Sequence, residues 1–189
     1  MESHFLSHFS PSLMPPEALE AIFVQREELL RNILERIGIS ALTQKKHHTL
    51  LVGPRGIGKT HLISMIYYRL QAMGELRGRI RVAWLREEEW GVSCFRDLVF
   101  SILRALISEE ADSQAAEQRL TSLYALEPDH VEPAAIDWIR ELVGQRTLVI
   151  LAENIDDLFQ KLSSTGQTQL YRFLQEDLSC CVVAASPGP

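Results

Sequence analysis

The sequence predicts an α/β fold in which a parallel sheet is covered by helices on both faces. Short apolar segments of strand length alternate along the chain with longer segments whose apolar residues recur at helical spacing. Two polar motifs, one rich in glycine and one rich in acids, each follow an apolar segment. Ligands in parallel α/β folds bind beyond the carboxyl ends of the strands, so these two motifs are the candidate functional regions.

Four apolar segments are the predicted strands, and helical patterns separate them. The strands are HHTLLVG (47–53), RIRVAWL (79–85), TLVILA (147–152) and SCCVVAAS (179–186). Helices are expected from Glu17 to a stop at Gly38, from Lys59 to before Gly74, over 93–108, within the polar segment 109–130, over 132–143 and in turns that reach Asp177.

The composition is that of a single globular domain of the cytoplasm. The chain has 189 residues, of which 46% are hydrophobic and 23% are charged, enough for one sizeable core. No apolar run approaches the ~20 residues of a membrane span, and the N-terminus has no signal-peptide pattern. The three cysteines provide no disulfide framework, and the adjacent Cys180 and Cys181 are expected to be small buried residues. The net charge of −6 gives no general attraction to nucleic acid or to an anionic membrane.

The glycine-rich motif GPRGIGKT, residues 53–60, fits the phosphate-binding pattern G-x-x-x-x-G-K-[ST]. Its glycines let backbone N–H groups face phosphate oxygens, and the following helix directs its positive end at the same anion. Lys59 is expected to reach the β- and γ-phosphates, and the Thr60 hydroxyl is expected to bind Mg²⁺. An ordinary glycine-rich turn is the alternative, but this motif follows a predicted strand and opens a predicted helix. The predicted nucleotide cradle comprises Gly53, Pro54, Arg55, Gly56, Ile57, Gly58, Lys59, Thr60 and His61.

Three segments together resemble the AAA+ superfamily of P-loop ATPases, in particular its Orc/Cdc6-like or STAND-like bacterial branch. IFVQREELLRNIL (22–34) is similar to the box that precedes the P-loop, GPRGIGKTHL to the Walker A loop, and LVILAENIDDLF (148–159) to the Walker B strand and turn. Gln25 departs from the box, where the family usually has Gly. The resemblance extends over about residues 17–186 and implies a P-loop NTPase core that binds ATP with Mg²⁺.

The resemblance also implies that Phe23, Val24 and Arg26 lie near the adenine. Two alternatives stay open: Phe23 and Val24 pack a helix onto the sheet, and Arg26 pairs with nearby glutamates on the surface. Ser186, at the end of the last predicted strand, is either the polar sensor that touches the γ-phosphate or an ordinary strand-end serine.

The stretch ENID can be aligned with the family's D-E-x-D turn in two frames. In the first frame, Glu153 takes the place of the catalytic glutamate and Ala152 replaces the metal-binding aspartate. In the second frame, Glu153 takes the metal-binding place, Asn154 replaces the catalytic glutamate and Asp156 matches the final aspartate. We prefer the second frame because it keeps a carboxylate near Mg²⁺. A further alternative is that the acids only cap the next helix.

An asparagine can orient an attacking water but cannot accept its proton, so the second frame predicts slow hydrolysis. The candidate catalytic residues are therefore Asn154, Asp156 and Ser186, and the candidate metal ligands are Thr60 and Glu153. We expect a flexible segment over 1–16 and the nucleotide-binding core over 17–189. That core is expected to be truncated after the fourth strand, without the fifth strand and lid of an AAA+ domain.

The resemblance implies a protein that couples ATP binding and slow hydrolysis to the assembly or remodelling of a partner. The partner can be DNA or another protein, a longer form of the protein is expected to be a homo-oligomer, and no membrane is involved. Two other interpretations remain: a STAND-like nucleotide-sensing switch with little turnover, and a degenerate interaction domain that binds no nucleotide.

Overall fold

A four-stranded parallel sheet forms the centre of the protein. The computed structural model describes residues 14–23, 26–86, 92–110, 113–177 and 179–188. The strands are β1 (Thr49–Val52), β2 (Ile80–Leu85), β3 (Thr147–Ala152) and β4 (Cys180–Ser186), and their order in the sheet is β1-β4-β3-β2. All three strand pairs are parallel, which confirms the predicted α/β fold, and no fifth strand occurs among the described residues.

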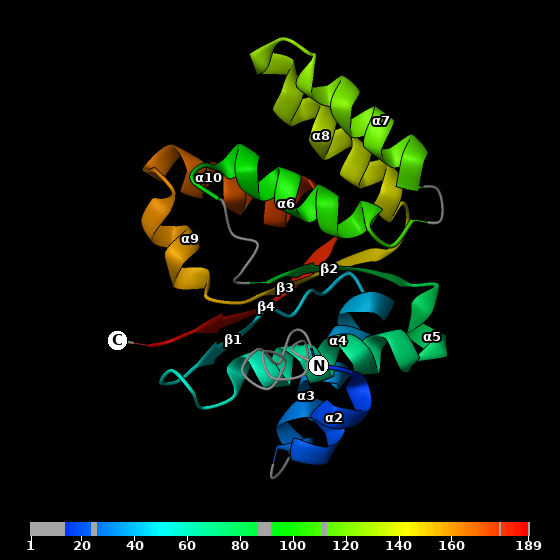
Figure 1. Ribbon diagram of the computed structural model, residues 1–189, viewed down its shortest axis with the longest axis vertical. Helices are drawn as coiled ribbons and strands as arrows, with labels where there is room; N and C mark the ends of the chain where they lie inside the picture. The colour runs from blue at the N-terminus through cyan, green and yellow to red at the C-terminus, as the bar shows by residue number, and fades with distance from the viewer. Residues whose placement is uncertain (1–13, 24–25, 87–91, 111–112, 178, 189) are drawn as a thin grey trace, which may run out of the picture.

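Helices cover both faces of this sheet, as predicted (Figure 1). The first face carries α2 (Pro16–Ile22), α3 (Glu27–Leu42), α4 (Lys59–Ala72) and α5 (Gly74–Arg77). The second face carries α6 (Phe95–Ile107), α8 (Pro128–Val143), α9 (Ile155–Lys161), α10 (Ser164–Arg172) and a π-helical turn (Phe173–Asp177), while α7 (Ser113–Tyr124) packs on α8. Each helix in the described part of the chain is too short or too polar to serve as a membrane span.

Strands β2, β3 and β4 each contribute to two separate cores, because successive side chains point to opposite faces of a sheet. Strand β1 contributes only Leu51, to the core on the side of α2–α5. Val149 and Leu151 of β3 belong to the core that α2–α5 complete. Leu148 and Ile150 of the same strand belong to the core formed with α6–α10. A strand buried on both faces reads as a continuous apolar run, which is why TLVILA was recognisable in the sequence.

Two predicted helix boundaries are wrong. Helix α3 continues through Gly38 to Leu42, because Ile37 and Ser40 are buried and the Ser40 hydroxyl accepts a hydrogen bond from the His47 N–H at 2.9 Å. A glycine within a helix costs only about 1 kcal/mol, which this packing offsets. Helix α8 begins at Pro128, ahead of the expected residue 132, because proline is well suited to the first helical position.

Ordered contacts begin inside the N-terminal segment that the sequence predicted to be flexible. The expected flexible segment 1–16 stays a prediction for residues 1–13, which lie outside the described residues. Met14 is buried, and its carbonyl accepts a hydrogen bond from the Tyr68 hydroxyl at 3.2 Å. Helix α2 then begins at Pro16, so ordered contacts include the last three residues, 14–16, of the segment that the sequence predicted to be flexible.

The cysteines of β4 are protected by burial, and this gives a test of the fold. Cys180 and Cys181 are fully buried, and burial raises the pKa of each thiol to about 12. The thiolate is the species that reacts with Ellman's reagent. Of the three cysteines, we therefore expect Cys94 alone, which is partly exposed, to react rapidly near neutral pH. The variant Cys94→Ser should show no fast thiol until denaturant is added. Fast labelling of either strand cysteine in that variant would contradict the position of β4.

Candidate functional site

The glycine-rich loop and the acidic turn lie at the same edge of the sheet. Val52, the last residue of β1, is paired with Ser186, the last residue of β4. The Gly53 N–H donates to the Ser186 carbonyl at 3.3 Å, so the loop begins beside the end of β4. Because β4 also pairs with β3, the end of β3 at Ala152 points to the same edge. Three strand ends therefore surround one position, as expected of a ligand site in a parallel sheet.

The loop turns sharply at two glycines. Gly56 and Gly58 have φ angles of 78° and 91°, in the left-handed region where a side chain is strained. A Cβ atom on Gly58 would also lie 3.2 Å from a nitrogen of the Arg26 guanidinium. The turn folds the chain back, so that the Lys59 ammonium donates to the carbonyls of Gly53 at 2.5 Å and Pro54 at 3.0 Å. The glycines and the lysine of the motif are thus gathered within a single closed loop.

Helix α4 begins at this loop without a side-chain cap. Gly58 occupies the N-cap position, and the first helical hydrogen bond runs from the Leu62 N–H to the Gly58 carbonyl at 3.0 Å. The N–H groups of the first helical turn point out of the helix toward the loop, and such a helix end carries a partial positive charge. Loop, lysine and helix end together make a local environment suited to a phosphate group.

The segment before β1 contacts the loop from the side. The Arg26 guanidinium donates to the Ile57 carbonyl, and so adds a positive charge beside Gly58. The Phe23 ring meets the His61 ring edge-on with centroids 5.3 Å apart, and His61 Nε2 donates to the Leu19 carbonyl at 2.9 Å. Phe23 and Arg26 are thus brought to the loop, whereas predicted Val24 lies outside the described residues.

Glu153 follows β3 directly and is buried, with 3% of its surface exposed. Its backbone N–H donates to the Leu85 carbonyl at 3.1 Å and so extends the pairing of β3 with β2. Its carboxylate oxygen Oε1 accepts a hydrogen bond from the Trp84 indole N–H at 2.9 Å. The acid is therefore held in place from the neighbouring strand.

Asn154 and Asp156, the other two predicted residues of this turn, are oriented differently from Glu153. Asn154 is the one non-glycine residue with a positive φ in the described part of the chain, at 51°, and it precedes α9. Asp156 lines an apolar groove of about 430 Å³ on the face of the sheet opposite α4, and its Oδ2 atom is buried without a hydrogen-bond partner among the described residues. Asp156 thus lines the groove, and its role in catalysis stays a prediction.

Ser186 remains close to the loop. It is buried, and its hydroxyl oxygen accepts a hydrogen bond from the Gly188 N–H at 3.0 Å. A hydroxyl that accepts one hydrogen bond can still donate its own proton, so Ser186 retains a donor for a phosphate oxygen. The sensor role and the role of an ordinary strand-end serine are both compatible with this position.

The residues at this edge fit a magnesium ion. Mg²⁺ prefers oxygen ligands and usually binds proteins through one or two side chains together with phosphate oxygens and waters. The Thr60 hydroxyl, at the start of α4, and the Glu153 carboxylate are ligands of this kind. Within the described residues no group of three or more His, Cys, Asp or Glu side chains forms a separate metal site. At this edge Thr60 and Glu153 would supply protein oxygens to the ion, and phosphate oxygens and waters would supply the rest.

A glycine-rich loop that joins a parallel strand to an uncapped helix, with a lysine folded across it, is the arrangement of P-loop proteins. The family model "AAA ATPase domain" matches residues 22–183. The chain therefore belongs to the AAA ATPase domain family, and its membership supports nucleotide binding. A search of curated proteins gives no significant match.

Solved structures share the fold at low sequence identity. The Aeropyrum pernix ORC1 protein in complex with DNA matches with a TM-score of 0.60 and 19% identity, over 93% of this chain and 42% of that one. Drosophila ORC bound to DNA matches with a TM-score of 0.59 and 23% identity, over 92% and 40%. The Aeropyrum pernix ORC2 protein matches with a TM-score of 0.59 and 13% identity, over 88% and 42%. The chain thus spans about two fifths of the length of these proteins.

Sequence reasoning missed one residue at the site, Trp84. The strand RIRVAWL contains no motif that marks a functional residue, and the hydrogen bond from Trp84 joins residues 69 positions apart. The available signal was indirect: a buried indole N–H requires an acceptor, and the nearest strand end in a parallel sheet supplies one.

The left-handed backbone of Asn154 predicts an unusual order of stability among substitutions. Asn154→Gly and Asn154→Ala both remove the amide, but only alanine strains the left-handed conformation. We expect urea denaturation to give Asn154→Ala a free energy of unfolding about 1 kcal/mol below that of Asn154→Gly. At exposed Glu35 within α3, the alanine variant should instead be the more stable of the pair. The same order at both positions would contradict the turn described here.

Proposed function

We propose that the protein binds ATP with Mg²⁺ at the loop 53–60 and couples binding, with slow hydrolysis, to the assembly or remodelling of a partner. The observation that carries this proposal is the closed loop itself. The loop brings the Lys59 ammonium and the uncapped start of α4 to the edge where β3 and β4 end. Membership in the AAA ATPase domain family supports the same conclusion.

The positive groups around the loop are matched to a polyphosphate. Lys59 would exchange its two loop carbonyls for the β- and γ-phosphates, and the N–H groups of α4 would donate to the same oxygens. Arg26 lies beside Gly58 and Phe23 beside His61, which supports a role for both at the nucleoside end. Magnesium, when bound, neutralises phosphate charge, and Thr60 and Glu153 would hold it.

The proposed rate of hydrolysis depends on Asn154. Glu153 extends strand β3 and is buried, whereas Asn154 occupies the turn that follows, so the second alignment frame is favoured. An amide can orient a water but cannot accept its proton, and positioning supplies much of the acceleration in phosphoryl transfer. We therefore propose slow turnover.

A nucleotide-sensing switch with little turnover is the second candidate, and Asn154 is the observation that favours it. The degenerate interaction domain is less well supported, because both Lys59 and Thr60 are present and the loop has its closed shape. The two surviving candidates differ in turnover rather than in the site.

The partner and the oligomer are further proposals. The matched structures include proteins in complex with DNA, and the chain spans only about two fifths of their length. The net charge of −6 provides no general attraction to DNA, so any DNA contact would require a local basic surface. We propose that a longer form of the protein is a homo-oligomer that engages DNA or another protein.

Nucleotide binding is tested by Lys59→Ala. The variant removes a charged hydrogen-bond donor from the phosphates, and a hydrogen bond to a charged group contributes about 1.5–3 kcal/mol, so ATP affinity should fall by about tenfold or more. Isothermal titration calorimetry measures the affinity. Exposed Lys45 provides the matched control, since Lys45→Ala removes the same charge away from the loop and should bind like wild type. Equal affinities for both variants would refute the proposed cradle.

The alignment frame is tested by Asn154→Glu and Glu153→Gln. In the preferred frame, Asn154→Glu restores a proton acceptor, and turnover measured on a longer form of the protein should rise at least tenfold, since general bases contribute ~10²–10⁴-fold. Glu153→Gln should weaken Mg²⁺-dependent ATP binding. Asp157, whose carboxylate pairs with Lys161 at 2.7 Å, provides the control variant Asp157→Asn, which should match wild type in both measurements.

The other frame predicts the reverse pattern. Glu153→Gln would then keep tight ATP binding and abolish turnover, while Asn154→Glu would change little. Affinity by calorimetry and turnover by phosphate release, measured on the same preparations, decide between the frames. The pattern of the preferred frame would support the proposal that Asn154 makes hydrolysis slow. The pattern of the other frame would refute that part of the proposal.

A further inference from the structure

Trp84 links the edge strand β2 to the acid at the end of β3. Its indole N–H donates to Glu153 Oε1 at 2.9 Å, and both side chains are buried, with 5% and 3% of their surfaces exposed. The pairing of β2 with β3 places Trp84 next to Leu151, and the Glu153 N–H in turn bonds to the Leu85 carbonyl. The indole and the carboxylate are therefore aligned by the backbone of two adjacent strands.

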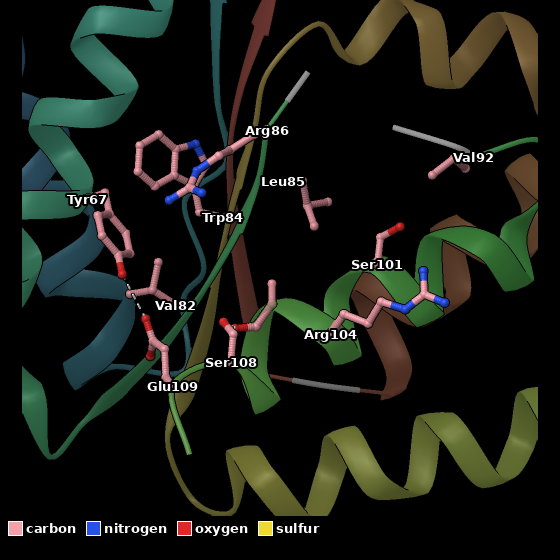
Figure 2. Close-up of a pocket in the computed structure, with 11 residues that line it drawn as sticks. Tyr67, Val82, Trp84, Leu85, Arg86, Val92, Ser101, Arg104, Ser108 and Glu109 are labelled. Carbon is pink, nitrogen blue, oxygen red and sulfur yellow. Dashed lines mark hydrogen bonds between the residues drawn. The ribbon is translucent and has the colours of Figure 1, made fainter. Parts of the chain in front are cut away.

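The indole ring itself is held from several sides. The Tyr67 ring lies 4.7 Å from it and the Tyr68 ring 6.3 Å, measured between centroids, and both tyrosines belong to α4. The Arg86 guanidinium stacks over the Trp84 ring at 4.4 Å. Figure 2 shows Tyr67, Trp84 and Arg86 together along one wall of a cavity of about 460 Å³. A ring confined in this way presents its N–H in one direction.

We propose that Trp84 is a positioning residue that orients the Glu153 carboxylate for the magnesium ion of a bound nucleotide. This inference rests on the proposed function, in which Glu153 is a metal ligand. It adds a residue that no motif identifies and that lies on a different strand from every predicted site residue.

The chemistry of the indole suits this role. An indole N–H can only donate a hydrogen bond, so the indole cannot compete with the carboxylate for a metal and cannot act as a base toward it. A carboxylate has two oxygens and about four lone pairs, so a hydrogen bond at Oε1 does not by itself prevent the same group from binding a metal. Partners that orient a metal ligand typically contribute 10–100-fold in metal affinity, because without them the ligand rotates away from the productive position.

A purely structural role makes a different prediction. If the hydrogen bond only satisfied a buried acid, its loss would lower stability without selectively affecting magnesium. If it orients the acid, its loss should weaken the magnesium-dependent part of nucleotide binding and spare the rest. The ratio of nucleotide affinities with Mg²⁺ and with a chelator therefore separates the two roles.

The experiment compares Trp84→Phe with wild type by isothermal titration calorimetry, using ATP in Mg²⁺ and ATP in EDTA. Phenylalanine keeps an aromatic ring in the cluster and lacks the N–H. We expect unchanged affinity in EDTA and a 10–100-fold smaller enhancement by Mg²⁺. Tyr67→Phe is the matched control: it alters the same aromatic cluster and removes the 3.1 Å hydrogen bond to Glu109, but keeps the Trp84 N–H. It should behave like wild type in both conditions.

Repeating the Trp84→Phe substitution in a Glu153→Gln variant shows whether Trp84 acts through Glu153 or through a general effect on the core. In Glu153→Gln the magnesium enhancement should already be lost, so adding Trp84→Phe should change nothing further. Should Trp84→Phe fail to fold by circular dichroism, Trp84→Met, which also fills the core without an N–H donor, takes its place in the same comparison.

The outcomes separate this inference from the function on which it rests. If wild type binds ATP with a magnesium enhancement that Glu153→Gln removes but Trp84→Phe keeps, the positioning role is refuted and the proposed function stands. If wild type binds no ATP, or if Glu153→Gln keeps the enhancement, the role of Glu153 fails and the role of Trp84 fails with it.

Discussion

Strand β4 is the constraint on which the site depends, because it pairs with β1 on one side and β3 on the other. Parallel pairing requires all these strands to run in one direction, so their carboxyl ends meet at one edge of the sheet. The loop after β1, Ser186 at the end of β4 and Glu153 after β3 are neighbours for this reason alone. These three segments share a site only when β4 lies between β1 and β3, so the site is a product of long-range contacts.

Positive charge is concentrated on one side of this edge. The Lys59 ammonium bonds to two carbonyls of its own loop, and the Arg26 guanidinium bonds to a third. The start of α4 adds a helix dipole, which stabilises a nearby anion by about 0.3–1 kcal/mol. These groups are brought together by an acidic protein with a net charge of −6, so their effect is local and does not reflect the overall charge. Donors already gathered at one place lower the cost of ordering them around a phosphate, although Lys59 must exchange its two loop carbonyls for phosphate oxygens.

The acidic side of the edge is held more rigidly than a surface carboxylate would be. A buried carboxylate is costly unless hydrogen bonds replace its water, and the Trp84 indole supplies one such bond to Glu153. The rings of Tyr67 and Tyr68 fix the indole against α4, the same helix that begins at the glycine-rich loop. Helix α4 thus contacts both halves of the site, the phosphate loop through its first turn and the acid through the aromatic cluster on its later turns.

The sequence by itself determined those features that are encoded by contiguous residues. Apolar periodicity placed all four strands, and the loop 53–60 was recognisable because its glycines, lysine and threonine are close neighbours in the chain, so local backbone geometry follows from local composition. Tertiary structure decided the rest. Gly38 lies inside α3 because burial of Ile37 and Ser40 outweighs its weak helix propensity, and the guanidinium of Arg26 finds a carbonyl 31 residues away. The pairing of Trp84 with Glu153 joins residues 69 positions apart, and it exists only because β2 and β3 are neighbours in the sheet, an order that no local pattern in either strand encodes.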